Sequence, residues 1–265
     1  MSSHILVFDS GIGGTTVLEH IQASLPHASF SYFMDNAYLP YGKLSSQQII
    51  ARLTSLLHFI ETEKLHVDIL VIACNTASTS ALAAIRALTT IPIVGVVPAI
   101  KPAAALTKSK RIGLLATPAT TCNTYTQQLI ESYGQGVTVD LYSSVELVAI
   151  AEQLYLTGEY SESRFEQEMQ RLAVHKETDV IVLGCTHFPI LAKHINSYYD
   201  GAIQLLDSGA AIANRVSALL NNDGDKESQR EASSILVAQK KPLHYYATAS
   251  VLTTKLTIVR VKLID

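Results

Sequence analysis

The sequence predicts an α/β protein made of two similar domains with mainly parallel sheets. Short apolar runs that end in small or polar residues alternate with segments of helical periodicity, a pattern typical of parallel sheets covered by helices. The run Val67–Ser78 contains Cys74, and a near copy of it, Thr178–Pro189, contains Cys185. In both copies an Asp precedes four branched apolar residues, a small residue and then the Cys. This repeat predicts two equivalent strands, one in each half of the chain.

A second repeat also indicates a duplication. Ile5–Gly14 is a strand-like run followed by a loop of small residues, and so is Ile112–Thr120. Chance recurrence is the alternative, because a buried free cysteine behaves as a small apolar residue. We predict two domains related by a pseudo-twofold axis, residues 1–98 plus 208–265 and residues 99–207. The two cysteines would then face each other across an interdomain cleft that holds the active site.

The first half of the chain begins with a strand and alternates from there. Pro26 ends the first helix, and Ser45 or Ser46 is suited to cap the second helix. The expected strands lie at residues 4–8, 29–34 and 93–97 and in the run before Cys74, and the expected helices lie at residues 15–25, 49–60 and 77–88.

The second half repeats this alternation. The expected strands lie at residues 111–116, 137–142, 179–184 and 203–207, and the expected helices lie at residues 99–106, 119–132, 144–156 and 161–174, after Pro189, and at 210–220. Asp207–Gly209 repeats the Asp-Ser-Gly of Asp9–Gly11, and the helix after it is expected to complete the first domain. We expect a solvated loop at residues 221–230 and one more strand after Pro242.

Composition excludes several classes of protein. A chain of 265 residues that is 48% hydrophobic can bury a large core. The net charge of −3 and the lack of any Lys/Arg run argue against nucleic acid as a partner. Three cysteines without Cys-x-x-Cys spacing form neither a zinc ribbon nor a disulfide framework. With no signal-like N-terminus and no long apolar run, we expect no membrane contact and a cytoplasmic protein with reduced thiols.

Cys74 and Cys185 are the main candidate catalytic residues. Each follows a strand, at the end of an open parallel sheet where ligands bind, and a helix is expected to begin directly after it. An ordinary thiol is mostly protonated at neutral pH, so it needs polar neighbours or a helix N-terminus to act as a base. Two facing thiols can remove a proton from one side of a carbon and return one to the other side. The same pair could instead be a nucleophile and a spectator, or metal ligands, although no ligand spacing connects them to Cys122 or His187.

Polar residues beside the thiols could move protons or bind substrate. Asp9 ends the first strand and His187 follows Cys185 by two positions, so each could exchange a proton with a thiol. The loop Asp9–Gly14 presents backbone N–H groups suited to a carboxylate, without the lysine or glycine register of a nucleotide loop. Neutral donors and acceptors directly after the cysteines are Asn75, Thr76 and Thr186. All these residues could alternatively serve only as loop or helix caps.

Four segments in order resemble the glutamate racemases of the aspartate/glutamate racemase superfamily: Phe8–Gly14, Pro40–Gly42, Ala73–Ala77 and Leu183–Pro189. The resemblance covers about residues 4–220. It implies interconversion of L- and D-glutamate by a two-base mechanism without a cofactor or metal, to supply D-glutamate for peptidoglycan. It also implies glutamate as the small-molecule partner.

The resemblance implies a role for each matching residue. Cys74 would deprotonate D-glutamate with help from Asp9, and Cys185 would deprotonate L-glutamate with help from His187. A further family carboxylate aligns with Glu152, although the Cys-Pro segment before it is replaced here by Ser144-Val145. The implied substrate contacts are Asp9, Ser10, Tyr41, Gly42, Asn75, Thr76, Thr186 and His187.

The end of the chain departs from the family. His244–Ser250 resembles the closing strand of these enzymes, but Ala249 replaces a glycine, which leaves the C-terminal packing and a homodimer contact open. Three alternatives remain: a racemase of aspartate or another acidic amino acid, a cysteine-nucleophile amidase or hydrolase, and a regulator that binds another protein. The last is included because some relatives bind DNA gyrase, although no segment here indicates it.

Overall fold

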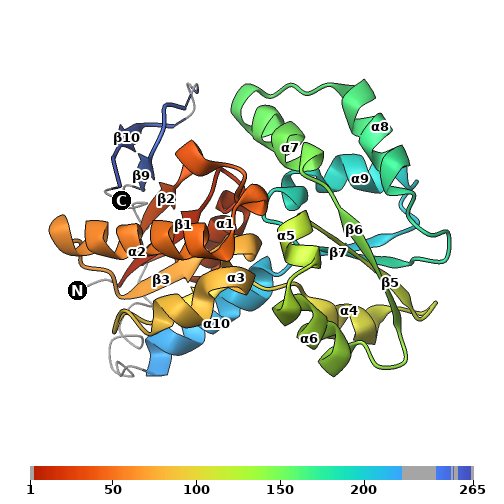
Figure 1. The fold of residues 1–265 in the computed structure, drawn as a ribbon, viewed down its shortest axis with the longest axis horizontal. Helices are drawn as coiled ribbons and strands as arrows, with labels where there is room; N and C mark the ends of the chain where they lie inside the picture. Colours follow the sequence, from red (N-terminus) through yellow and green to blue (C-terminus); the bar gives the residue numbers. More distant parts are fainter. Residues whose placement is uncertain (1–2, 223–242, 252, 254–255, 264–265) are drawn as a thin grey trace, which may run out of the picture.

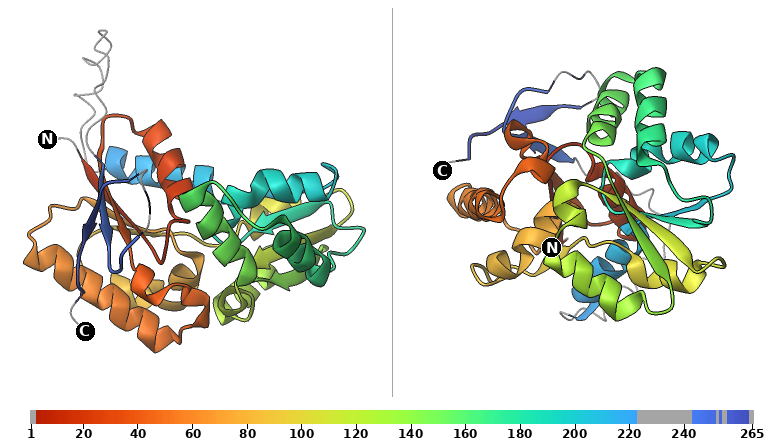
Figure 2. Two further views of the ribbon diagram at one scale, coloured as in Figure 1. Left: turned by 90° about the horizontal axis from the view of Figure 1, so that it is seen from above. Right: turned by 45° about the vertical axis from the view of Figure 1, so that its right-hand side comes forward.

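A computed structural model describes residues 3–222, 243–251, 253 and 256–263. The chain forms two parallel β-sheets that lie side by side, each with helices on both faces (Figures 1 and 2). We call the part around the first sheet the first half and the part around the second sheet the second half. The predicted α/β class with mainly parallel sheets is confirmed, because every strand pairs in parallel with its neighbours.

The strands come from all parts of the chain. The first sheet contains β1 (His4–Asp9), β2 (Ser29–Met34), β3 (Ile69–Ile72), β4 (Ile93–Gly95), β9 (His244–Ala247) and β10 (Ile258–Arg260). The second sheet contains β5 (Arg111–Ala116), β6 (Thr138–Ser143), β7 (Val180–Leu183) and β8 (Gln204–Leu206).

The two sheets share one strand order. The first runs β10-β9-β2-β1-β3-β4 and the second runs β6-β5-β7-β8, so in each half the first strand lies between the second and third. In sheets of this kind the order reverses between the first and third strands, and ligands bind at the carboxyl ends there. Cys74 lies just beyond β3, and Cys185 lies just beyond β7. The sequence repeat therefore reflects a repeated topology, and both cysteines lie at reversal points.

Helices cover both faces of the first sheet. One face packs against α1 (Thr15–Ser24) and α10 (Gly209–Asn222), and the other against α2 (Ser46–Thr62) and α3 (Asn75–Arg86). Alternate residues of β1 show the division, since Ile5 and Val7 face the first pair and Leu6 and Phe8 the second. Because α10 packs on α1, the chain returns to the first half after the second sheet, as the sequence predicts.

The second sheet is covered in the same way. One face packs against α7 (Glu146–Thr157), α8 (Glu162–Leu172) and the short helices η3 (Phe188–Leu191) and α9 (Ala192–Tyr198). The other face packs against α4 (Ile100–Leu106) and α6 (Thr124–Tyr133), with α5 (Pro118–Thr121) nearby. Two short helices of the first half complete the fold, η1 (Asn36–Tyr38) and η2 (Tyr41–Lys43).

Several local predictions need correction. The single helix expected at residues 119–132 is two helices, because Asn123 accepts a hydrogen bond from the backbone N–H of Tyr125 and starts α6. The α-helix expected directly after Cys185 is a 3₁₀ turn. Pro189 has no N–H to donate to the Cys185 carbonyl, so the Phe188 N–H closes a tighter turn at 3.1 Å.

The cap of α2 agrees with the sequence prediction, whereas the C-terminal strands differ from it. Ser45 caps α2 in a reciprocal arrangement with Gln48, as expected. The tail holds two short strands, β9 and β10, where one was expected. Most of the loop predicted at residues 221–230 lies outside the described residues. No helix in the described part of the chain is long and apolar enough to cross a membrane.

Candidate active site

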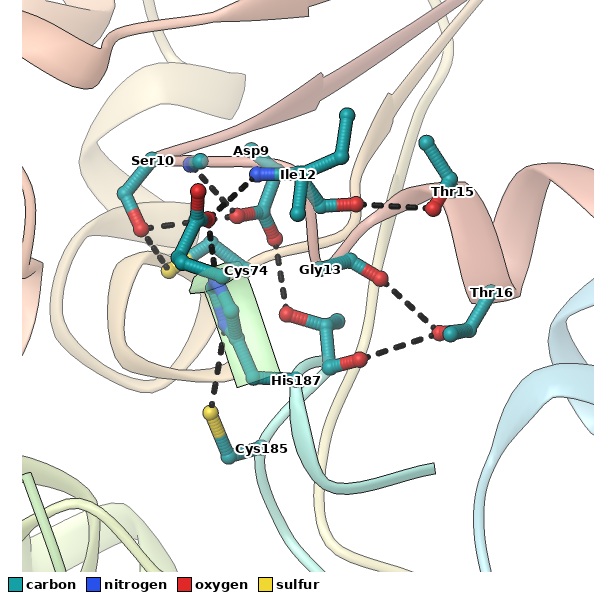
Figure 3. Close-up of polar contacts among 12 residues, drawn as sticks. Asp9, Ser10, Ile12, Gly13, Thr15, Thr16, Cys74, Cys185 and His187 are labelled. Atoms are coloured by element: carbon teal, nitrogen blue, oxygen red, sulfur yellow. Dashed lines mark hydrogen bonds and ion pairs between the residues drawn. The ribbon is translucent and has the colours of Figure 1, made fainter. Parts of the chain in front are cut away.

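The predicted residues converge where the two halves meet (Figure 3). Asp9 ends β1, Cys74 is the N-cap residue of α3, and Cys185 and His187 lie in the turn after β7. Glu152, the weakest assignment from sequence, reaches the same place from α7. The two cysteine residues retain 5% and 7% of their accessible surface, so both are buried but neither is sealed completely.

Cys74 lies in an acidic and weakly polar setting. Its sulfur is 3.8 Å from the Ser10 hydroxyl, which in turn donates to Asp9 at 3.4 Å. Burial and the nearby Asp9 carboxylate raise the pKa of the Cys74 thiol, while the backbone N–H of Ala77 in the first turn of α3 opposes them. The helix N-terminus is thus present, as predicted, but burial and negative charge outweigh it. Cys74 is held as a neutral thiol.

Asp9 is itself fully buried and accepts hydrogen bonds from both halves. One carboxylate oxygen accepts the Gly11 backbone N–H at 2.8 Å, and the other accepts the Thr186 hydroxyl at 2.9 Å. Burial raises the pKa of the Asp9 carboxyl, and the nearby His187 acts in the opposite direction. Asp9 therefore caps its own loop and also joins the end of β1 to the turn beside Cys185.

Cys185, His187 and Glu152 form a row in which each side chain contacts the next. Its sulfur lies 3.7 Å from Nδ1 of His187, and Nε2 of His187 lies 2.7 Å from Oε1 of Glu152. Because a carboxylate only accepts hydrogen bonds, Nε2 carries the proton, and Nδ1 of a neutral ring is free to accept the thiol proton. Burial disfavours charge on His187, but its contacts with Cys185 and Glu152 raise its pKa well above the ordinary value. The arrangement can hold a proton on the imidazole beside Cys185.

Glu152 is fixed by a second contact from the first half. Its Oε1 accepts the backbone N–H of Ile12 at 2.7 Å. The glycine loop allows this approach, since a Cβ on Gly11 would overlap Oε1 of Glu152, and a Cβ on Gly13 would lie 2.5 Å from Nδ1 of His187. The contact joins residues that are 140 positions apart, and no local sequence pattern reports it.

Thr186 and Thr16 tie the turn after β7 to the first half. Thr186 donates to Asp9, and its carbonyl oxygen accepts the Thr16 hydroxyl at 3.1 Å. The same Thr16 hydroxyl contacts the Gly13 carbonyl oxygen at 2.9 Å. These bonds hold the turn beside Cys185 against the loop beside Cys74 (Figure 3).

A cluster of three hydroxyls lies at the same junction, and two of them, Thr117 and Thr120, were missed from sequence. Thr76 Oγ1 is 2.9 Å from Thr117 Oγ1 and 3.3 Å from Thr120 Oγ1, which are 3.2 Å from each other. Thr117 follows β5 as Ser10 follows β1, so the weaker sequence repeat could have identified it. Such hydroxyls can donate hydrogen bonds to a carboxylate.

Three other predicted residues lie next to this junction. Tyr41 is buried and packs in the core cluster that contains Cys74, but its hydroxyl donates to Asp35 at 2.6 Å. Gly42 abuts the second half, since a Cβ on it would lie 2.8 Å from Cβ of Thr117. Asn75 contacts the Val96 carbonyl oxygen through its amide at 3.3 Å.

The cavity that lies between the halves beside Cys185 is small. A cavity beside Cys185, Asn75 and Thr186 has a volume of about 10 Å³, at the lower limit for one water molecule. A larger groove of about 730 Å³ lies elsewhere on the second half, beside Asp179 and Lys193, and includes none of the predicted site residues. An amino acid can therefore reach both thiols only if the two halves or the surrounding loops move apart.

The described residues contain no group of three or more His, Cys, Asp or Glu side chains that could hold a metal ion.

Comparisons with known proteins identify the family of this chain. A family model described as Asp/Glu/Hydantoin racemase matches residues 15–216. A glutamate racemase from Shewanella sp. (strain MR-7) is 48% identical over 240 residues, which cover 90% of this chain and 88% of that protein. Escherichia coli glutamate racemase, solved in complex with L-glutamate and activator UDP-MurNAc-ala, is 32% identical with a TM-score of 0.86, and the match covers 100% of both chains. Glutamate racemase isoform RacE1 from Bacillus anthracis is 26% identical with a TM-score of 0.79, and the match covers 98% of both chains.

Proposed function

The chain belongs to the Asp/Glu/hydantoin racemase family and is an amino-acid racemase; we propose that it interconverts L- and D-glutamate with two cysteines as its acid and base. The proposed substrate rests on the similarity to glutamate racemases across most of the chain. We further propose that the reaction needs no cofactor, and that it supplies D-glutamate for peptidoglycan.

One observation carries the mechanism: the two buried thiols lie just beyond equivalent strands, and the polar groups beside each of them contact the Asp9–Gly14 loop. Inversion of a carbon centre requires a base on one face and an acid on the other. Cys74, whose pKa is raised by burial and Asp9, suits the acid. Cys185, which can pass its proton to His187, suits the base.

In the proposed reaction of L-glutamate, Cys185 removes the proton from the α-carbon. The Cys74 thiol then gives its proton to the opposite face, which yields D-glutamate and leaves Cys74 as the thiolate. In the reverse reaction the two cysteines exchange roles. His187 and Glu152 would stabilise the ionised form of Cys185 by holding its proton, and Asp9 would serve Cys74 in the same way.

Substrate binding would use the polar groups around the thiols. We propose that the ammonium and the two carboxylates of glutamate contact Asp9, Ser10, Tyr41, Gly42, Asn75, Thr76, Thr186 and His187. Because the cavity is nearly closed, the halves must part for entry and then close again. Closure removes water from around the reacting carbon, so the surrounding charges and dipoles act on it without screening.

Some wider aspects of the function are also proposals. We propose that the two sheets mark the two domains expected from sequence, residues 1–98 plus 208–265 and residues 99–207. We also propose that the enzyme works in the cytoplasm and that it forms a homodimer.

The decisive test is incubation of purified protein with L-glutamate in deuterated water without added cofactor. We expect circular dichroism to decay to zero and deuterium to enter the α-carbon of the inverted product. Consumption of an amide or ester substrate without α-deuteration would instead identify a hydrolase. Faster inversion of aspartate than of glutamate would assign the chain to the aspartate enzymes.

A further inference from the structure

Thr248 and Ala249, which directly follow β9, are hydrogen-bonded to the loop that leads into the Tyr41-Gly42 segment. The side-chain amide of Asn36 donates to the Ala249 carbonyl at 3.1 Å, and its oxygen accepts the Ala249 N–H at 2.8 Å. The Thr248 hydroxyl accepts the Ala37 N–H at 3.0 Å and donates to Asp35 at 2.8 Å. Residues more than 200 positions apart are thus joined by four hydrogen bonds.

The buried carboxylate of Asp35 accepts hydrogen bonds from several residues of this region. The residue is 0% exposed and accepts Nε of Arg52 at 2.9 Å and a terminal guanidinium N–H of Arg52 at 3.0 Å. It also accepts the Tyr41 hydroxyl at 2.6 Å, in addition to the Thr248 hydroxyl. A paired and hydrogen-bonded buried carboxylate holds its partners in one geometry, because loss of any partner leaves charge without compensation.

The next residues touch the second half. Tyr41 is 1% exposed and packs beside Phe8 and Cys74. A side chain at position 42 would overlap Thr117, so only Gly42 fits there. The hydroxyl of Thr117 is hydrogen-bonded to that of Thr76. A small displacement of the Tyr41-Gly42 segment would therefore change the junction where we place the substrate.

We propose that Asp35 is a positioning residue that makes the placement of Tyr41 and Gly42, and hence substrate binding, depend on Thr248 at the end of β9. This inference rests on the proposed function, because it assigns Tyr41 and Gly42 to the substrate site. It gives the C-terminal strand a role in binding, although that strand lies on the far side of β2 from β1.

The kinetic test uses one hydroxyl and a matched control. Thr248→Val removes the hydroxyl with little change of shape, and we expect KM for glutamate to rise about three- to tenfold, the effect of one or two lost hydrogen bonds, with kcat within about twofold. Thr248→Ser keeps the hydroxyl and should restore the wild-type KM. Thr257→Val makes the same change at an exposed site in the same tail and should leave KM unchanged.

A second readout follows the loop itself and does not need activity. The chain has no tryptophan, so Tyr38→Trp introduces into this loop a single tryptophan, which can be excited at wavelengths that the tyrosines do not absorb. The Tyr38 ring lies 4.1 Å from the Arg52 guanidinium carbon, so the emission of the introduced indole should report the loop's position against Arg52. In this background Thr248→Val should shift the emission of the folded protein, and Thr248→Ser and Thr257→Val should not.

The two readouts separate the possible outcomes. A raised KM together with a shifted emission supports the proposal. A lower melting temperature with both readouts unchanged would show that Thr248 only stabilises the fold, and a change in one readout alone would also overturn the coupling. If wild-type protein does not racemise glutamate, the proposed function fails, whereas the fluorescence still decides whether Thr248 positions the loop.

Asp35→Asn tests the centre of the cluster. It removes the negative charge that faces Arg52, so in the Tyr38→Trp background it should shift the emission more than Thr248→Val does. If Asp35→Asn folds and neither the emission nor KM changes, Asp35 is not a positioning residue.

Discussion

Cys74 and Cys185 occupy equivalent places in the two halves, yet their surroundings differ. Each lies just beyond the third strand of its sheet. Asp9 ends β1 near Cys74, whereas the equivalent end of β5 is Ala116, which has no carboxylate. Cys185 instead has His187 beside it, at the position where the first half has Thr76.

The backbone after the two thiols differs as well. Cys74 is followed by a regular α-helix, in which the Ser78 N–H donates to the Cys74 carbonyl at 2.9 Å. Cys185 is followed by a tighter turn because of Pro189, and this turn brings the His187 ring back toward the sulfur. The repeat thus places the two thiols, and the differences between the halves give one an acidic setting and the other an imidazole. In the proposed mechanism each thiol acts as base for one enantiomer and as acid for the other, so these differences give each direction its own proton-accepting partner.

The largest expected effect comes from removing either thiol. Cys74→Ser and Cys185→Ser should each lower racemisation of both enantiomers by about 10³-fold or more, because each direction needs one acid and one base. Elimination of chloride from β-chloroglutamate needs only the base. It should survive for the L form in Cys74→Ser and for the D form in Cys185→Ser, measured as release of ammonia and 2-oxoglutarate. Unimpaired racemisation by either variant would contradict the mechanism.

The next effect tests the partner of each thiol. His187→Asn should slow elimination from L-β-chloroglutamate about 100-fold and affect the D form far less, and Asp9→Asn should do the reverse. The kcat/KM values of racemisation cannot reveal this difference between the L and D forms. Because the equilibrium constant between the two enantiomers is one, kcat/KM must be equal in the two directions for any variant. Equal slowing of both eliminations by each variant would show that the partners do not act on separate thiols.

A smaller effect should appear in alkylation of the free enzyme. Because the pKa of Cys74 is raised while Cys185 can pass its proton to His187, iodoacetamide should label Cys185 about tenfold faster near neutral pH. The exposed Cys122 is first replaced by Ser so that it does not compete. Peptide mass spectrometry measures both rates, and His187→Asn should reduce the difference. Faster labelling of Cys74 would reverse our assignment.

The smallest effects concern stability, and they should have opposite signs at the two sites. Burial raises the pKa of Asp9 above 3.8, so the ionised carboxylate destabilises the folded state at neutral pH. Asp9→Asn should therefore raise the free energy of unfolding near pH 7. The gain should shrink as pH falls through the folded pKa toward 3.8, where wild type is protonated in both states.

His187 should show the opposite behaviour. Burial acts against its charged form, but the contacts with Cys185 and Glu152 prevail and raise its pKa above 6.5, so the charged ring stabilises the folded state. His187→Asn should lose stability below about pH 6, and the loss should shrink as pH rises through the folded pKa. Urea denaturation across pH measures both variants. The same sign for both would show that the two settings are not distinct.

Much of this arrangement follows from local sequence. Buried strands followed by Cys74 and Cys185 were identifiable, because four branched apolar residues ending in a small residue suit the middle of a parallel sheet. Asp9 was identifiable because it ends the first strand. The tight turn after Cys185 could have been predicted too, since Pro189 is visible in the sequence and cannot donate a hydrogen bond.

Other features depend on how the halves dock. Glu152 meets Ile12 and His187 only because α7 lies against the first half, and no spacing along the chain encodes that contact. The bond from Asp35 to Thr248 has the same origin, because β9 returns to the first sheet after most of the chain. Sequence therefore indicated which residues could react, while docking decided which of them support the reactive groups.

In the proposed mechanism, the separate polar groups beside the two thiols have a consequence for successive turnovers. After L-glutamate leaves as the D form, the proton that began on Cys74 is gone and Cys185 carries the one it removed. The free enzyme is then protonated for the opposite enantiomer until a proton crosses back between the sulfurs. While the halves are closed, that reset depends on the few hydroxyl, carboxylate and imidazole groups around the thiols. At high concentrations of one enantiomer, the reset becomes the slow step and molecules accumulate in the form that awaits the other.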